Sequence, residues 1–220
     1  IDKKAVQSES FRYSGHTEFL AAETAVKDYL MLMVSPQLRI GMVTGHIPLS
    51  SVAGALTQEK IESKLNILDY SLRQDFGVIR PRIAVLGLNP HASDDGLLGE
   101  EEHKIISPVI ERANASGKLV FGPYPSDGFF GAMGHLKFDG VLAMYHDQGL
   151  IPFKLTAFHE GVNFTAGLPV IRTSPAHGTA FDIAGKDIAN HDSMLQAIFL
   201  AQQIYENRLA FLELQAAAMR

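Results

Sequence analysis

Three apolar segments of the sequence each end in a histidine. The segments MVTGHIPL, VLGLNPHA and LAMYHDQG place His46, His91 and His146 after runs that are typical of buried strands. Because the carboxyl ends of parallel strands lie along one edge of a sheet, three such histidines could meet at one point. Neutral imidazole is a ligand of Zn²⁺, and also of cobalt, nickel and iron. Three protein ligands leave one coordination position open, which is typical of a catalytic metal site.

Each of these histidines also has a simpler interpretation. A loop histidine can equally well hold a hydrogen bond to the backbone. The spacing of the three is also not a local ligand motif such as HExxH. Because all three occupy equivalent positions after an apolar segment, the metal site is the favoured hypothesis, and the simpler interpretation stays open.

Two further groups of polar residues suggest that an anion binds. His16 and Thr17 come directly before a predicted helix, where free backbone N–H groups and the helix dipole favour a negative charge. Lys154, Asn163 and Arg172 lie in an otherwise apolar region, where an ammonium and a guanidinium suit phosphate or carboxylate. The alternatives are that His16 or Thr17 only caps the helix, and that the cations are solvated loop charges.

Helical and strand-like patterns alternate along the chain. Strands separated by helices favour an α/β fold with a largely parallel sheet flanked by helices. The helix at 57–77 has Thr57 as its expected N-cap and Gly77 just past its end, and Pro108 should interrupt or bend the helix at 99–117. The other helices are expected at 18–33 and after Asp192, and the strands at 39–46, 82–92 (with a loop), 119–122, 140–147, 162–165 and 170–173.

The composition is that of an ordinary globular protein and argues against several classes. The net charge of -5 and the scattered Lys and Arg residues argue against a nucleic-acid partner. The absence of cysteine excludes disulfides and thiolate metal sites, and it fits a cytoplasmic location. No apolar stretch approaches the ~20 residues that span a bilayer, so we expect no membrane association. The chain begins at Ile1 without Met, which suggests a processed or truncated product.

Five motifs together resemble one known family. SGHTEF, TGHIPL, GLNPHA, LAMYHDQGL and RTSPAHGTAFDIAGK occur in the order and at the spacing of the 4-hydroxythreonine-4-phosphate dehydrogenases of pyridoxal phosphate (vitamin B6) biosynthesis. The resemblance covers essentially the whole chain and implies the fold of isocitrate and isopropylmalate dehydrogenases. Family members have a substantial portion before the segment IDKKAV. Residues 1–220 are therefore expected to form the C-terminal portion of a two-domain enzyme, with the first domain incomplete.

The resemblance also implies roles for particular residues. His46, His91 and His146 would hold a divalent metal, either zinc or Mg, Co or Mn, at a homodimer interface to which the partner subunit contributes one histidine. Asp147 would orient a metal ligand or relay a proton. The implied substrate-binding positions are His16, Thr17, Lys154, Asn163 and Arg172, and the implied positions for binding NAD or NADP are His177, Gly178, Thr179 and Asp182.

The implied reaction is an oxidative decarboxylation. The secondary hydroxyl of 4-phosphohydroxythreonine would be oxidised to a ketone with NAD, and loss of CO2 would then give 3-amino-2-oxopropyl phosphate. A metal would make the hydroxyl proton easier to lose and would stabilise the negative charge formed as CO2 departs. Lys154, Asn163 and Arg172 would anchor the anionic groups of this phosphorylated hydroxy-amino acid.

Three loops depart from the family pattern and keep other functions open. PHASDDG replaces a glycine-rich loop, Ala176 stands where Asp is common, and Gly128 stands where Thr is frequent. The substrate could therefore be a related phosphorylated hydroxy acid, such as threonate or erythronate phosphate. Three histidines with an open position would also serve a metal-dependent hydrolase or lyase. A non-catalytic binding or dimerisation module is the third alternative.

Overall fold

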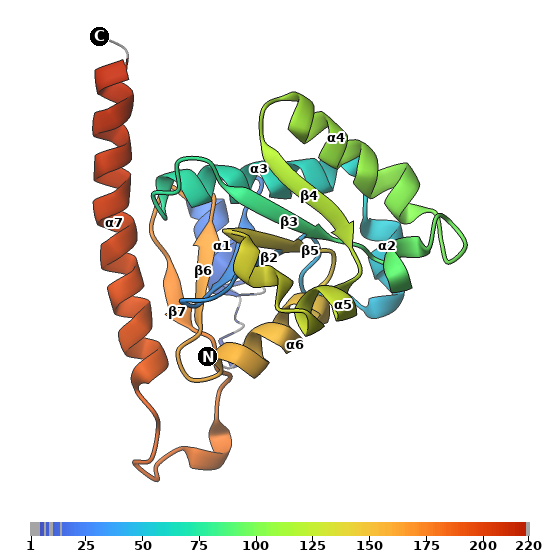
Figure 1. Cartoon of the computed structure of the whole chain (residues 1–220). Coiled ribbons are helices and arrows are strands. Elements are labelled where there is room, and N and C mark those ends of the chain that lie inside the picture. The colour runs from blue at the N-terminus through green and yellow to red at the C-terminus, as the bar shows by residue number, and fades with distance from the viewer. Residues whose placement is uncertain (1–4, 7, 9–10, 14, 219–220) are drawn as a thin grey trace.

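A seven-stranded mixed sheet forms the centre of the molecule (Figure 1). The computed structural model describes residues 5, 6, 8, 11–13 and 15–218. Strands β4, β3, β5 and β2 run parallel to one another, whereas β1 and β7 run antiparallel to their neighbours. In the order in which they lie across the sheet, the strands are β4 (Leu119–Tyr124), β3 (Arg82–Leu86), β5 (Gly140–Ala143), β2 (Arg39–Met42), β1 (Leu30–Val34), β6 (Val162–Ala166) and β7 (Thr173–Pro175). The predicted α/β fold is therefore confirmed.

Helices cover both faces of the sheet and bury a core on each. One core packs α3, α4 and part of α7 against residues such as Leu32, Val85 and Phe164. The other packs α5 and α6 against the alternate strand residues, such as Met42 and Ala143. This alternation follows from the two-residue period of a strand. The helices are α1 (His16–Glu23), α2 (Val52–Ala55), α3 (Gln58–Gln74), α4 (Ser107–Ala115), α5 (Ser126–Gly131), α6 (His146–Ala157) and α7 (Asp192–Ala218), with a π-helical turn at Glu102–Ile106.

The expected helix boundaries near Thr57 and Pro108 are confirmed. The Thr57 hydroxyl accepts a hydrogen bond from the backbone N–H of Lys60 at 3.2 Å and so caps α3. Gly77 follows the end of α3 with φ at +68°, a conformation that glycine adopts without strain. The helix expected at 99–117 divides just before Pro108 into the π-helical turn and α4, because proline cannot donate the hydrogen bond of a continuous helix.

Two predicted elements are wrong. The helix expected at 18–33 ends at Glu23, and Leu30–Val34 is strand β1 in the interior of the sheet. A short apolar run that is buried on both faces cannot be distinguished by periodicity from part of a buried helix. The strand expected at 170–173 begins only at Thr173 and extends to Pro175, where it pairs with β6.

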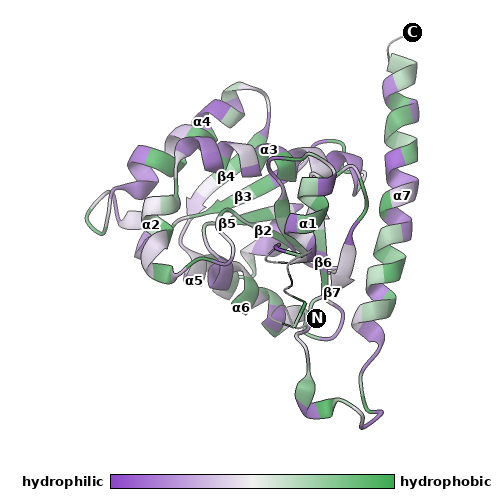
Figure 2. Ribbon diagram, turned by 180° about the vertical axis from the view of Figure 1, so that it is seen from behind, coloured by the Kyte–Doolittle hydropathy of each residue, from purple (hydrophilic) through white to green (hydrophobic). Residues whose placement is uncertain are grey.

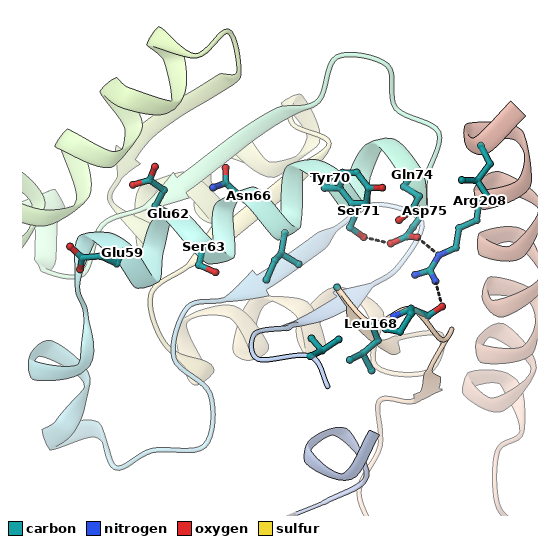
Figure 3. Close-up of a pocket in the computed structure, with 15 residues that line it drawn as sticks. Glu59, Glu62, Ser63, Asn66, Tyr70, Ser71, Gln74, Asp75, Leu168 and Arg208 are labelled. Carbon is teal, nitrogen blue, oxygen red and sulfur yellow. Dashed lines mark hydrogen bonds and ion pairs between the residues drawn. The ribbon is translucent and has the colours of Figure 1, made fainter. Parts of the chain in front are cut away.

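The long helix α7 lies at the edge of the molecule and is attached to α3 by a buried ion pair (Figure 3). The Arg208 Nε atom donates to Asp75 Oδ1 at 2.7 Å, and only 2% of the Asp75 side chain is exposed. The second carboxylate oxygen accepts from Ser71 Oγ at 2.5 Å. Much of α7 is nevertheless exposed and apolar, including Ile198 and Phe199 (Figure 2). None of the described helices is both long and apolar enough to cross a membrane.

Replacing Arg208 should destabilise the fold strongly. In the variant Arg208→Met the Asp75 carboxylate loses its cation while it stays buried, which typically costs about 3–5 kcal/mol. The matched variant Arg112→Met breaks an exposed pair with Glu62 of α3, which should cost less than about 1 kcal/mol. Urea denaturation followed by circular dichroism measures both values. Equal destabilisation by the two variants would contradict this account.

His135 is buried without a polar partner. Only 2% of the residue is exposed, and neither ring nitrogen has a hydrogen-bond partner among the described residues. Its ring lies 5.8 Å from that of Phe130, centroid to centroid. Burial lowers the pKa of the imidazole, because the charged form would lose its hydration. The folded state therefore favours neutral His135.

Stability should consequently fall on acidification. The unfolded histidine binds a proton below about pH 6.5, whereas the folded one binds it only at lower pH, so the free energy of unfolding decreases below that value. The variant His135→Leu should show a shallower decrease between pH 7 and pH 5 in denaturation experiments. His103→Leu, at an exposed histidine, should keep the wild-type slope. The same slope in all three proteins would contradict a role for His135.

Candidate functional site

His46 and His146 lie together at the carboxyl ends of the adjacent strands β2 and β5. Backbone hydrogen bonds continue beyond the strands, from Val43 N to Ala143 O at 2.8 Å and from Thr44 N to Met144 O at 3.1 Å. They hold the two chain segments side by side up to the histidines. The ring centroids of His46 and His146 are 5.3 Å apart. The rings line a cavity of about 170 Å³ together with Gly45, Ile47, Leu49, Val52, Tyr145 and Asp147.

Asp147 orients the ring of His146. Its Oδ1 atom lies 2.7 Å from Nδ1 of His146. Because a carboxylate only accepts hydrogen bonds, a neutral imidazole here carries its proton on Nδ1 and keeps the lone pair of Nε2 for a ligand. This is the arrangement that commonly fixes a metal-binding histidine. The arrangement fits the orienting role expected of Asp147, and its proton-relay role stays a prediction.

The chain enters a helix at this point, where no helix was expected. We expected a strand over 140–147, but β5 ends at Ala143 and His146 is the first residue of α6. Gly149 lies buried within α6. A Cβ atom there would lie 3.0 Å from Met42 Sδ, so the glycine allows α6 to pack closely on the sheet.

His91 lies outside this pair, on an unusual loop after β3. Five consecutive non-glycine residues, 91–95, have positive φ angles between 48° and 71°. Each such residue costs about 1–2 kcal/mol, so the loop must be held by other contacts. The side chain of His91 is exposed. Among the described residues, no three His, Asp or Glu side chains are grouped so that they could hold a metal ion.

The donor set at the His46–His146 pair fits part of a metal site. Two imidazoles on one Zn²⁺ ion would each bind through a Zn–N bond of about 2.0–2.1 Å. The 5.3 Å separation of the ring centroids is compatible with such sharing. Two ligands alone are fewer than a stable zinc site contains. A metal centre here would therefore need a further ligand from outside the group that one chain forms.

Asn163 and Arg172 lie on the face of the sheet that α6 covers. Asn163 stands opposite Met33, which belongs to the core beneath α6. Arg172 reaches the same face, where its Nη1 atom donates to Thr165 Oγ1 at 3.4 Å. Burial lowers the pKa of Arg172, and the negative charge of Glu18 acts in the opposite direction. Asn163 Oδ1 is buried without a hydrogen-bond partner among the described residues, so this face is suited to a polar ligand.

The other expected substrate residues, His16, Thr17 and Lys154, lie on helices. His16 and Thr17 open α1, and neither of them caps it, because the N-cap is Gly15. The negative charge of Glu18, in the first turn of α1, acts on Arg172. Lys154 lies on α6 with an exposed side chain. These positions are compatible with substrate binding, and the roles of all five residues stay predictions.

The expected cofactor residues lie on an exposed segment between β7 and α7. His177, Gly178 and Thr179 are exposed, and Asp182 belongs to a short 3₁₀ turn at Phe181–Ile183. The segment extends away from the sheet before the chain enters α7 (Figure 1). The ring of His177 makes a 2.9 Å contact with the carbonyl of Gly178. The structure therefore leaves these four residues accessible, and their role in binding NAD or NADP is untested.

A much larger cavity, of about 1010 Å³, lies on the other side of the sheet (Figure 3). It is bounded by α3, α7 and the turn at 167–169, and it contains none of the expected site residues. Its polar groups Asp75 and Arg208 are already paired with each other. The histidine pair therefore stays the candidate site that the residues expected from the sequence favour.

Sequence reasoning missed two buried polar residues beside the site. Gln148 donates through Nε2 to Gly87 O and to Ser126 Oγ, both at 2.6 Å, and accepts from Met144 N at 2.7 Å. Glu102 is only 2% exposed. It stands between Glu101 and His103 in the sequence GEEEHK, which looks like the solvated start of a helix. No sequence signal marks it as buried, because its partners are backbone groups of a distant loop.

Comparison with solved structures defines the class of fold. The chain superimposes on 92% of its length, with a TM-score of 0.82 and 46% identity, on a 4-hydroxythreonine-4-phosphate dehydrogenase from Klebsiella pneumoniae. It also matches a terephthalate 1,2-cis-dihydrodioldehydrogenase from Burkholderia xenovorans, with a TM-score of 0.71, 32% identity and 86% of the chain covered. The fold is thus that of a group of α/β dehydrogenases.

The family follows from the sequence comparisons. The model of the pyridoxal phosphate biosynthetic protein PdxA family matches residues 1–201, and the chain belongs to this family. A 4-hydroxythreonine-4-phosphate dehydrogenase from Bacteroides thetaiotaomicron is 51% identical over 209 residues, which are 94% of this chain. The chain spans 57% of that relative's length, and it covers 61% of the Klebsiella chain and 60% of the Burkholderia xenovorans chain.

Proposed function

We propose that this chain is the C-terminal portion of a two-domain, metal-dependent and NAD-linked dehydrogenase that oxidises and decarboxylates 4-phosphohydroxythreonine. The observation that carries the proposal is the pair His46–His146, oriented by Asp147, in a chain that is 51% identical to a relative of that name. The product would be 3-amino-2-oxopropyl phosphate. The proposal places the protein in pyridoxal phosphate biosynthesis, in agreement with its family.

The chain's own residues would bind and orient the substrate. Arg172 offers a partly desolvated guanidinium and Asn163 an amide whose oxygen lacks a partner, and both suit the anionic and polar groups of a phosphorylated hydroxy-amino acid. Lys154 would add a point charge. Holding these groups fixes the carbon that bears the hydroxyl, so that its hydride and its proton leave in defined directions.

The cofactors would supply the remaining chemistry. Nicotinamide would accept the hydride, and a metal held by His46 and His146 would make the hydroxyl proton easier to lose and would stabilise negative charge. The ketone formed lies β to the carboxylate, so CO2 can leave with its bonding electrons remaining on the substrate. A proton then replaces the carboxylate. His146 keeps its ligand nitrogen available throughout, because Asp147 occupies the other one.

The complete site would require a homodimer. His46 and His146 form one half of the ligand set, and His91 is exposed on a separate loop. We therefore assign His91 as the ligand that each subunit offers to the site of the other subunit. The exposed apolar residues of α7, among them Leu195, Ile198 and Phe199, support an association with a further polypeptide surface.

The central experiment is an oxidation assay with the complete gene product. We expect NADH formation, measured by absorbance, when 4-phosphohydroxythreonine and NAD are supplied, and its loss after treatment with a chelator. Zinc or another divalent metal should restore the rate. Threonate and erythronate phosphates serve as competing substrates, because the loops with Ala176 and Gly128 depart from the family pattern. Turnover that persists in the apo-protein, or that needs no NAD, would refute the proposal.

A subunit-mixing experiment tests the origin of the third histidine. The variants His91→Ala and His146→Ala should each lose bound metal and activity when prepared alone. Mixed dimers contain one intact site, so co-expression should restore about a quarter of the wild-type activity. As a control, the pair His46→Ala and His146→Ala should restore none, because both ligands come from the same subunit. Restoration by the control pair, or none by the first, would disprove the assignment of His91.

A further inference from the structure

We propose that Glu102 is a positioning residue that sets the His91 loop for the active site of the partner subunit. This inference rests on the proposed function, in which His91 acts across the dimer. Glu102 itself touches no reacting group. It would act through the backbone of residues 87–89, which lead from strand β3 into the loop.

Among the described residues, the carboxylate of Glu102 accepts hydrogen bonds only from Leu88 and Asn89 in this segment. Its Oε1 atom accepts hydrogen bonds from the backbone N–H of Leu88 at 2.6 Å and from that of Asn89 at 2.7 Å. Its Oε2 atom accepts from Asn89 Nδ2 at 2.9 Å. These contacts are short and charge-assisted, and they lie in a buried setting where hydrogen bonds are strongest. The carboxylate therefore fixes both the backbone and the side chain of Asn89, two residues before His91.

Gln148 holds the same segment from the opposite side. Its Nε2 atom donates to Gly87 O at 2.6 Å, while its Oε1 atom accepts from Met144 N at the end of β5. Gly87 lies so close to Glu102 that a Cβ atom there would be 3.0 Å from Oε1 and 3.1 Å from the Cα of Ala92. Residues 87–89 are thus fixed between two buried side chains, one of which lies two positions from His146.

The conformation of the loop explains why such a support is needed. Residues 91–95 are left-handed, a conformation that the free chain would leave without external contacts. The loop's own backbone bonds, such as Asp94 N to His91 O at 3.3 Å and Leu98 N to Ser93 O at 2.9 Å, join residues within the loop and do not set its position on the sheet. The bond from Ala92 N to Asn89 O at 3.2 Å connects the loop to the segment that Glu102 holds. Because Ala92 also bonds to Asn89, the position that Glu102 gives to Asn89 passes directly to the neighbouring His91.

The test places Glu102→Gln on one subunit of the mixed dimer at a time. In the restored dimer, the His146→Ala subunit supplies His91, and the His91→Ala subunit supplies His46 and His146. Glu102→Gln on the His146→Ala subunit should lower the activity and the zinc affinity of the restored site by about tenfold or more. On the other subunit it should leave both unchanged. Zinc affinity is measured by competition with a chromophoric chelator, and activity by NADH formation.

The outcomes separate this inference from the one on which it rests. If the mixed dimer without Glu102→Gln has no activity, the proposed function of His91 fails. If that dimer is active but Glu102→Gln acts equally from either subunit, Glu102 has only a structural role and the inference is wrong. Thermal unfolding of each mixture identifies a loss that comes from misfolding. The variant Glu100→Gln, at an exposed carboxylate paired with Lys104, is the matched control and should have no effect on either subunit.

Discussion

The structure depends most on the parallel pairing of β2 with β5 and of β5 with β3. Parallel strands place their carboxyl ends along one edge, and each of these three strands is followed by a histidine. The hydrogen bonds from Val43 and Thr44 extend the first pairing past the strands and keep His46 beside His146. Both faces of these strands are buried, which fixes their register. The position of the histidine pair therefore follows from strand pairing in the sheet and not from a local sequence motif.

Buried polar groups then determine which loops are rigid. Glu102 directs its hydrogen bonds at the end of β3, and Gln148 bonds to the ends of β3 and β5 and to Ser126 in α5, so the carboxyl edge of the sheet is fixed from within. Asn163 and Arg172 differ from them, because Asn163 Oδ1 has no partner in the part of the chain described and burial leaves the charge of Arg172 poorly solvated. Buried polar groups that already have hydrogen-bond partners hold the scaffold in place. Buried polar groups without such partners are suited to binding a ligand.

A third group of residues is exposed on the surface of the chain. His91 and the segment with His177 and Gly178 are exposed, and α7 carries apolar side chains such as Ile198 on its open side. Exposed apolar surface is unfavourable in water, and a single ligand does not form a metal site. Both features are therefore expected where a second surface makes contact. They agree with the proposed homodimer, and the chain spans about three fifths of its relatives' length.

The sequence by itself determined the alternation of strands and helices, the cap at Thr57 and the change at Pro108, because these depend on local patterns and backbone chemistry. It also indicated the three histidines and, as candidates for anion binding, His16, Thr17, Lys154, Asn163 and Arg172. It did not indicate α6, the helix that begins at His146. It failed at Leu30–Val34, where a short apolar run fits a helix and a buried strand equally well. Only the tertiary structure decided that His46 meets His146 while His91 lies apart, and that Glu102 is buried. Those facts depend on contacts between segments far apart in the chain, and local periodicity contains no information about them.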